Sequence, residues 1–211
     1  MKFLSSFVVA VVLSGCSLVP KPGIETRYVL APVQIQTSAM STVIMPQKDL
    51  PVLGIARPRV PVDLRTNQLV LIQNGTLTFY EGKSWSAPLP DTLGAAMIRD
   101  LANNLPEWIV TGDNALKSQR DLQLEVHDFA TIQNGSQATV IMNMDVRLVD
   151  ATTRDVIKIL PYRYSAPLTE LNTAQTIEAY NKGWSNLIQE IVTIMKTTPL
   201  TKDEMKSGRT S

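Results

Sequence analysis

The feature that most restricts the fold is a strict alternation of apolar and polar residues beyond the middle of the chain. Apolar side chains lie two apart in residues 121–129, and residues 138–150 repeat the pattern. The apolar members are Leu122, Leu124, Val126, Val140, Met142, Met144, Val146 and Leu148. A period of two with one apolar face is typical of strands that are buried on one side. This stretch is therefore predicted to be a sheet with one covered face.

Asparagine–glycine pairs mark the turns around this region. Asn74-Gly75 lies between two apolar runs in residues 69–80, and such a pair supplies the positive φ angles that a tight hairpin requires. A second pair, Asn134-Gly135, occurs in the same IQNG sequence with different flanks, which indicates shared turn chemistry and not an internal repeat. A third strand is expected at residues 156–164, interrupted by Pro161, so an antiparallel meander is predicted.

The region before these turns is less regular. Residues 25–35 are expected to form a first strand, residues 36–49 a polar loop, and residues 50–55 a second apolar run. Prolines recur every third residue in residues 56–61, which a central strand does not tolerate. This last segment is therefore predicted to lie at an edge or to be otherwise extended.

Two segments show the helical period instead. Apolar side chains lie four apart in residues 89–105, and Pro106 ends that pattern. Residues 173–196 carry a wider apolar stripe, which is enough to cover a sheet. The stripes consist of Leu93, Met97, Leu101 and Leu105, and of Ile177, Tyr180, Trp184, Leu187, Ile188, Ile191, Val192 and Met195. The predicted fold class is α/β, with a mixed, mostly antiparallel sheet covered by two main helices.

The only cysteine of the chain, Cys16, follows a segment with the layout of a secretory signal. Lys2 gives a charged start, and small residues come just before the cysteine. The apolar run at residues 7–13 is too short to span a bilayer as a helix, which takes roughly 20 residues. We interpret residues 1–15 as a lipoprotein signal peptide that is cleaved before Cys16.

Leu13-Ser14-Gly15-Cys16 resembles the lipobox of bacterial lipoproteins, in which the cysteine thiol is acylated. Several acyl chains give stable anchoring where one alone is marginal. The alternative is a free cysteine that behaves as a small buried hydrophobe. In Gram-negative lipoproteins an aspartate after the cysteine favours retention in the inner membrane. Ser17 is therefore interpreted as a sorting residue that directs the protein to the outer membrane.

The remaining chain suits one domain with two tails. Residues 16–24, with two prolines and a glycine, are expected to be a lipidated tether, residues 25–196 the domain, and residues 197–211 a disordered polar tail. Lysine and arginine total 20 against 19 acidic residues, without the clustered basic face that nucleic-acid binding requires. No nucleic-acid partner is expected.

Candidate catalytic residues are few. His127, the only histidine, lies on the polar face of its strand and is interpreted as a solvated surface side chain. A single histidine without a free cysteine cannot form a His/Cys metal site. Glu125 and Asp145 also fall on polar strand faces, where they could be neighbours, but exposed carboxylates of this kind are usually only solvated. Phosphate-binding glycine loops and G-x-S-x-G turns are absent. The sequence predicts no enzyme, no cofactor and no metal site.

Tryptophans and methionines are assigned to the core. Trp184 lies within the apolar stripe of the last helix, and Trp85 is placed where the first helix meets the sheet. Met142 and Met144 share the apolar face of one strand.

The order of these features resembles the ABC-type transport auxiliary lipoprotein family, which includes the PqiC-like lipoproteins of the paraquat-inducible Pqi system. The resemblance covers residues 28–195. It rests on the lipobox, on Tyr28-Val29-Leu30, and on VPVDLRTNQLVLIQNG and SWSAPLPDTLGAAMIRDLANNLPEWIV. The paired strands and the long last helix complete it. Its most specific part is Trp85-Ser86-Ala87-Pro88-Leu89 and the helix that follows.

The resemblance implies an outer-membrane lipoprotein that faces the periplasm and assists an MCE-domain protein in intermembrane lipid transport. It also implies a fold similar to the N-terminal domain of TolB, a homo-oligomeric ring, and no cofactor. Only Cys16 is carried over from the family, as the lipid attachment site. The alternative function is a stand-alone periplasmic lipid- or ligand-binding lipoprotein, which needs an apolar pocket under the helices. Residues 51–61 and 69–80 are the expected contact segments.

Overall fold

The alternating segments form the three longest strands of the sheet. A computed structural model describes residues 25–35, 50–112, 116–202 and 204. In it, β6 (Arg120–Asn134), β7 (Gln137–Asp150) and β8 (Val156–Leu168) pair antiparallel in chain order. Gly135, at φ 60°, closes the β6–β7 hairpin, as the Asn-Gly signal predicts. The predicted meander is confirmed.

The other edge of β6 accepts two separate strands. Near its start it pairs in parallel with β2 (Val52–Ile55), and near its end with β3 (Gln68–Gln73). β5 (Ile109–Gly112) lies beyond β2, while β4 (Thr76–Trp85) and β1 (Thr26–Tyr28) lie beyond β3. The 3₁₀ turn η2 (Val62–Leu64) lies between β2 and β3. The parallel pairings are short, so the sheet is mixed and mostly antiparallel, as expected.

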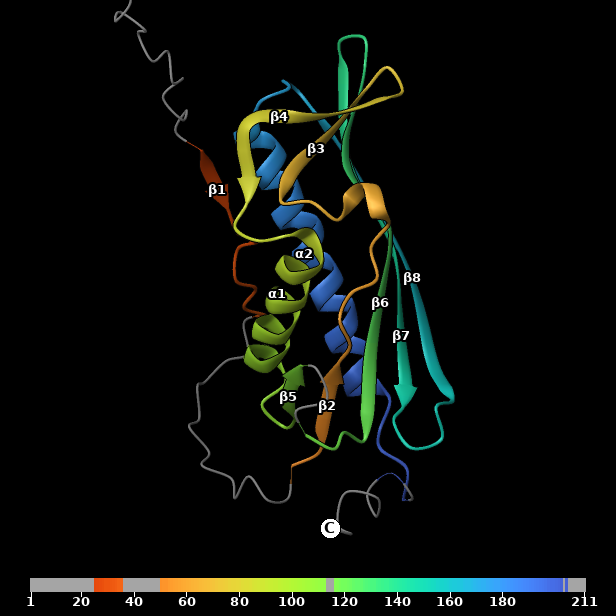
Figure 1. The fold of residues 1–211 in the computed structure, drawn as a ribbon. Coiled ribbons are helices and arrows are strands. Elements are labelled where there is room, and N and C mark those ends of the chain that lie inside the picture. The colour runs from red at the N-terminus through yellow and green to blue at the C-terminus, as the bar shows by residue number, and fades with distance from the viewer. Residues whose placement is uncertain (1–24, 36–49, 113–115, 203, 205–211) are drawn as a thin grey trace, which may run out of the picture.

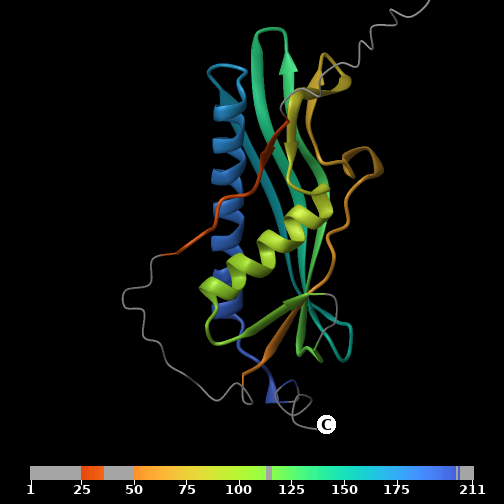
Figure 2. The same cartoon turned by 60° about the vertical axis from the view of Figure 1, so that its left-hand side comes forward.

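Both helices cover the same face of this sheet (Figure 1; Figure 2). α1 (Leu89–Asn104) packs beside β2 and β5, and α2 (Thr173–Thr197) packs on β7 and β8. Asn172 caps α2, since its Oδ1 accepts a hydrogen bond from the Gln175 N–H at 2.9 Å. Both predicted apolar stripes are buried, apart from a half-buried Ile177. The opposite face of the sheet is covered by neither α1 nor α2 and is called the open face below.

Aromatic side chains fill the junction between α2 and the sheet. Phe129 and Tyr180 stack with their ring centroids 4.5 Å apart. Trp85 meets both rings edge-on, at 5.8 Å and 5.5 Å. Trp184 is fully buried one turn further along α2. The core positions predicted for both tryptophans are confirmed, and the same holds for Met142 and Met144.

Two expected strand boundaries were wrong. The first strand ends at Tyr28 because the backbone of residues 30–35 bonds to helix side chains instead of to a strand. β8 is not interrupted at Pro161, because β8 is an edge strand, where a proline nitrogen that faces away from the neighbour removes no ladder bond. The loop expected at residues 36–49 lies outside the described residues.

The segment after α2 is fixed to the sheet. The buried Arg120 guanidinium bonds both oxygens of Glu204, at 2.7 and 3.1 Å, and the carbonyls of Thr198 and Pro199. It also lies over the ring of Trp108, 5.9 Å from the centroid. A disordered tail was expected from residue 197 on; these contacts concern only its first residues and Glu204, and residues 205–211 lie outside the described residues.

Candidate interaction surface

The half of the open face near the start of β6, which is the lower half in Figure 1, carries a row of ion pairs. Glu125 and Asp145 are direct partners across β6 and β7, so the expected proximity of these carboxylates is confirmed. Arg147 donates to Glu125 at 2.7 Å, and Arg163 donates to Asp145 at 3.1 Å. His127 lies at a bulge of β6 with its Nε2 3.0 Å from Asp145 Oδ2. Each of these two carboxylates therefore already has a cationic neighbour.

This network lacks the properties of an acid–base site. The hydrogen bond from His127, and then that from Arg163, holds the pKa of the Asp145 carboxyl below its usual value. A carboxylate with a lowered pKa is a weak proton acceptor near neutral pH. His127 itself is exposed, as expected. Among the described residues, no group of three or more histidine, cysteine or acidic side chains could hold a metal ion.

Apolar side chains gather on the upper half of the open face, beside Thr139 and Ser165. The Phe129 side chain points to α2, so that of Ala130 points to the open face, and its partner Ile141 shares that face. Ile132 has the same orientation. It is aligned with Ile72 of β3, which is aligned with Leu77 of β4, so all three side chains share this face. We call this set the apolar patch: Val70, Ile72, Leu77, Phe79, Ala130, Ile132 and Ile141.

The apolar patch is accessible at its β4 edge. Leu77 is 38% exposed and Phe79 39%. Ile72, Ile132 and Ile141 are half-buried, and Val70 and Ala130 are buried. Exposed apolar side chains that lie together, as Leu77 and Phe79 do, are typical of interaction sites. The expected contact segment 69–80 thus includes most of the patch. In segment 51–61 the apolar residues Val52, Leu53, Ile55 and Val60 are buried, so this segment adds none of these side chains to the exposed edge of the patch.

The two IQNG turns lie side by side above the patch. Ile72 is aligned with Ile132, and Gln73 with Gln133, in the parallel pairing of β3 and β6. The Gln73 amide donates to Gln133 Oε1 at 2.9 Å, and the Gly135 N–H donates to Asn74 Oδ1 at 3.3 Å. The repeated sequence therefore joins two hairpins into one end of the molecule (Figure 1). Its matching register was not evident from the sequence.

The N-terminal segment is held across both helices. Residues 30–35, called the strap, are extended, and their backbone N–H groups bond Asn181, Asp100 and Asn104. Asn104 makes two hydrogen bonds to the strap: its Oδ1 accepts from the Ile35 N–H, and its Nδ2 donates to the Val33 carbonyl at 2.8 Å. The strap fixes the direction in which the chain reaches β1.

Asp100 is the centre of this arrangement. It is fully buried and accepts hydrogen bonds from Val33 N, from Trp184 Nε1 at 2.8 Å and from the Arg99 guanidinium. Asp100 and Asn104 do not belong to the apolar stripe of Leu93, Met97, Leu101 and Leu105, and no role was predicted for them. The signal in the sequence was their spacing: Asp100 and Asn104 are four residues apart, so they lie on the same face of the helix.

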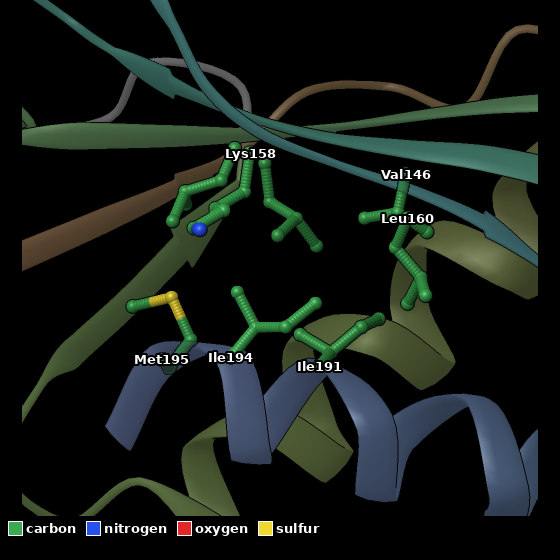
Figure 3. A pocket seen from close by; sticks show the side chains of 8 residues that line it. Val146, Lys158, Leu160, Ile191, Ile194 and Met195 are labelled. Carbon is green, nitrogen blue, oxygen red and sulfur yellow. The ribbon is translucent and has the colours of Figure 1, made fainter. Parts of the chain in front are cut away.

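A small apolar cleft separates the last turns of α2 from the sheet (Figure 3). Figure 3 shows Ile191, Ile194 and Met195 of α2 facing Val146, Lys158 and Leu160 of the sheet. Its void is about 10 Å³. A single water needs at least about 10–15 Å³ measured in this way. The cleft as it stands has no room for an acyl chain.

Cys16 and Ser17, the predicted lipidation and sorting residues, lie outside the described residues. Among the helices of the described part of the chain, none is both long enough and apolar enough to cross a bilayer.

Comparisons with known proteins agree with this architecture. The family model described as ABC-type transport auxiliary lipoprotein component matches residues 28–192. A crystal structure of a protein from Xanthomonas campestris is similar, with a TM-score of 0.63 and 18% identity, over 79% of this chain and 92% of that one. A second, uncharacterized protein gives 0.63 and 17%, over 81% and 98%. At these identities the structures show a shared fold. No curated protein matched the chain.

Proposed function

Since the chain belongs to the ABC-type transport auxiliary lipoprotein family, we propose that it is the non-enzymatic accessory subunit of an MCE-type, Pqi-like intermembrane lipid transport system. In this proposal it is a lipoprotein of the outer membrane, on the periplasmic face. The observation that carries the proposal is the family match over residues 28–192, which reaches from the end of β1 into α2.

Anchoring is the first part of the proposed mechanism. Acyl chains on Cys16 hold the protein at the membrane, and Ser17 permits sorting to the outer membrane. Ten residue steps separate Cys16 from Thr26, so this stretch reaches at most about 35 Å. The strap then ties the chain to α1 and α2. The domain is thus held close to the membrane and in a restricted orientation.

Partner binding is the second part. The apolar patch has the composition of an interface core, and the neutral Asn-Gly turns at Asn74 and Asn134 adjoin its upper end. We propose that an MCE-domain protein of the same system contacts this patch. Self-association into a ring, which the family resemblance implies, would present several such patches to one partner and raise its apparent affinity.

The alternative, a stand-alone lipid or ligand carrier, requires an apolar pocket under the helices. The cleft beside α2 has a void of about 10 Å³, far smaller than the cavities of 300 Å³ or more that hold drug-sized ligands. A larger cleft of about 360 Å³ lies between α1 and residues 55–58, but its lining includes the charged pair Arg57 and Asp91, which does not suit an acyl chain. The accessory role therefore has more support than the carrier role.

The test is affinity purification of the acylated protein from solubilised envelopes, followed by mass spectrometry of the bound proteins. We expect an MCE-domain protein to be recovered with the wild type and to be lost or reduced with Cys16→Ala. Recovery of bound lipid without such a protein would favour the carrier instead.

A further inference from the structure

A cleft of about 140 Å³ opens on the lower half of the open face, between residues 56–59 and strands β6 and β7. Four of its eight lining residues are arginines, and one is a carboxylate. The lining consists of Ala56, Arg57, Arg59, Gln123, Leu124, Glu125, Arg147 and Arg154. The cationic side chains therefore outnumber the anionic ones within the cleft by three.

A β-bulge produces this cleft, and Pro58 explains the bulge. Ile55 is aligned with Leu122, and Arg59 with Glu125, so the segment advances four residues while β6 advances three. The Ala56 N–H bonds the Leu122 carbonyl at 3.0 Å. In regular parallel pairing, residue 58 would donate next, to Leu124. Proline has no N–H, and the Leu124 carbonyl bonds Arg59 N at 2.9 Å instead.

One guanidinium of the cleft, that of Arg59, has no carboxylate partner among the described residues. Three of the arginines have carboxylate partners: Arg57 bonds Asp91 at 2.8 Å, Arg147 bonds Glu125 at 2.7 Å and Arg154 bonds Asp121 at 2.7 Å. No ion pair joins Arg59 to another described residue. Glu125, its register partner, is engaged by Arg147 from the other side.

We propose that this cleft is a binding site for a phosphate group. Guanidinium groups bind the oxygens of phosphate through paired, charge-assisted hydrogen bonds. Arg59 supplies the free donor, and Arg57 and Arg147 of the same lining are further donors. The carboxylate partner of Arg57, Asp91, lies outside the lining, whereas that of Arg147, Glu125, belongs to it. The phosphate comes either from a lipid headgroup or from a free phosphate, and both have the same tetrahedral, anionic chemistry. This inference goes beyond the proposed function and does not depend on the MCE-domain partner.

The test is a titration of the purified, acylated protein in neutral detergent micelles, followed by nuclear magnetic resonance of the arginine side chains. The probes are inorganic phosphate and glycerophosphoglycerol, the water-soluble headgroup of phosphatidylglycerol. We expect saturable shifts at Arg59, and a rise in Kd of at least fivefold in Arg59→Gln. Arg163→Gln is the matched control, since Arg163 lies on the same face, outside the cleft, and should leave Kd unchanged.

The two probes identify the source. Tighter binding of glycerophosphoglycerol supports a lipid headgroup, and tighter binding of inorganic phosphate supports a free phosphate. Absence of saturation by either probe at 10 mM, which is about a hundredfold above a Kd of 0.1 mM, would overturn the proposal. Equal weakening in both variants, or binding of acetate as tight as that of phosphate, would also overturn it.

Discussion

The indole N–H of Trp184 donates a hydrogen bond to the Asp100 carboxylate, 2.8 Å away, in the interior between the two helices. The same carboxylate accepts from Val33 N in the strap. One buried acid thus joins α1, α2 and the N-terminal segment.

Asp100→Ala should lower the free energy of unfolding by about 3 kcal/mol, because two buried N–H donors lose their acceptor at about 1–3 kcal/mol each. Denaturant unfolding measures this loss. Asn103→Ala, on the exposed side of the same helix, is the control and should change stability by less than about 0.5 kcal/mol. Equal losses in the two variants would show that the Asp100 network adds nothing to stability.

Gly183 permits the close approach of α2 to the sheet. A β-carbon there would lie 2.5 Å from Met142 Sδ and 2.6 Å from Tyr164 Cδ1. Alanine gains about 1 kcal/mol over glycine in a helix, but overpacking costs about 1–3 kcal/mol. We expect Gly183→Ala to be destabilising in thermal unfolding.

Gly94→Ala in α1 is the matched control, since its β-carbon would meet only Pro58, with Cδ 3.3 Å away. It should be neutral or stabilising by up to about 1 kcal/mol. If both alanine variants were stabilising, the close packing at Gly183 would be refuted.

The Arg120–Glu204 pair makes the segment after α2 sensitive to acid. Burial alone would raise the pKa of Glu204, but the hydrogen bonds from Arg120 and Thr201 outweigh it and hold the pKa below the usual value. A lowered pKa in the folded state contributes stability above the unfolded pKa, near 4.5, and loses it as the pH falls through the folded pKa.

Glu204→Gln should therefore cost about 2 kcal/mol at pH 7, because Arg120 keeps a neutral acceptor but loses its counter-charge. The difference in unfolding free energy from the wild type should shrink as the pH falls below 4.5. A difference that stays constant down to pH 2.5 would contradict the role of the charge.

Two substitutions test the proposed anchor. Cys16→Ala removes the thiol that carries the lipid, so we expect the protein to leave the membrane fraction. Ser17→Asp should move the acylated protein from the outer to the inner membrane, whereas Ser17→Ala, the control, should leave it in place. Density-gradient fractionation of the envelope measures both effects. Outer-membrane recovery of the Ser17→Asp variant would contradict the sorting role.

Local patterns predicted most of the elements, because the side-chain period reports directly on burial. The stripe from Leu93 to Leu105 and the alternation from Leu122 to Leu148 both depend on residues near one another in sequence. The Asn-Gly turns were predictable for the same reason.

Contacts between distant residues were not predictable in this way. Arg120 and Glu204 are 84 positions apart, and nothing in either local sequence indicates the pair. The strap has an apolar composition that suits a strand, yet its backbone partners are the side chains of Asp100, Asn104 and Asn181. Pro58 signalled an extended segment, but the arginine cleft also depends on the register of β6. The lipid on Cys16 and the role of Ser17 stay predictions.

The proposed contact between the apolar patch and an MCE-domain protein can be tested in the cell. The most direct measurement is photo-crosslinking in living cells, with a photoreactive amino acid in place of Phe79 and, as a control, in place of Ile159. Ile159 lies on β8 and is 58% exposed. We expect a crosslink from position 79 to an MCE-domain protein, identified by mass spectrometry, and none from position 159. Crosslinks from both positions alike, or from neither, would contradict it.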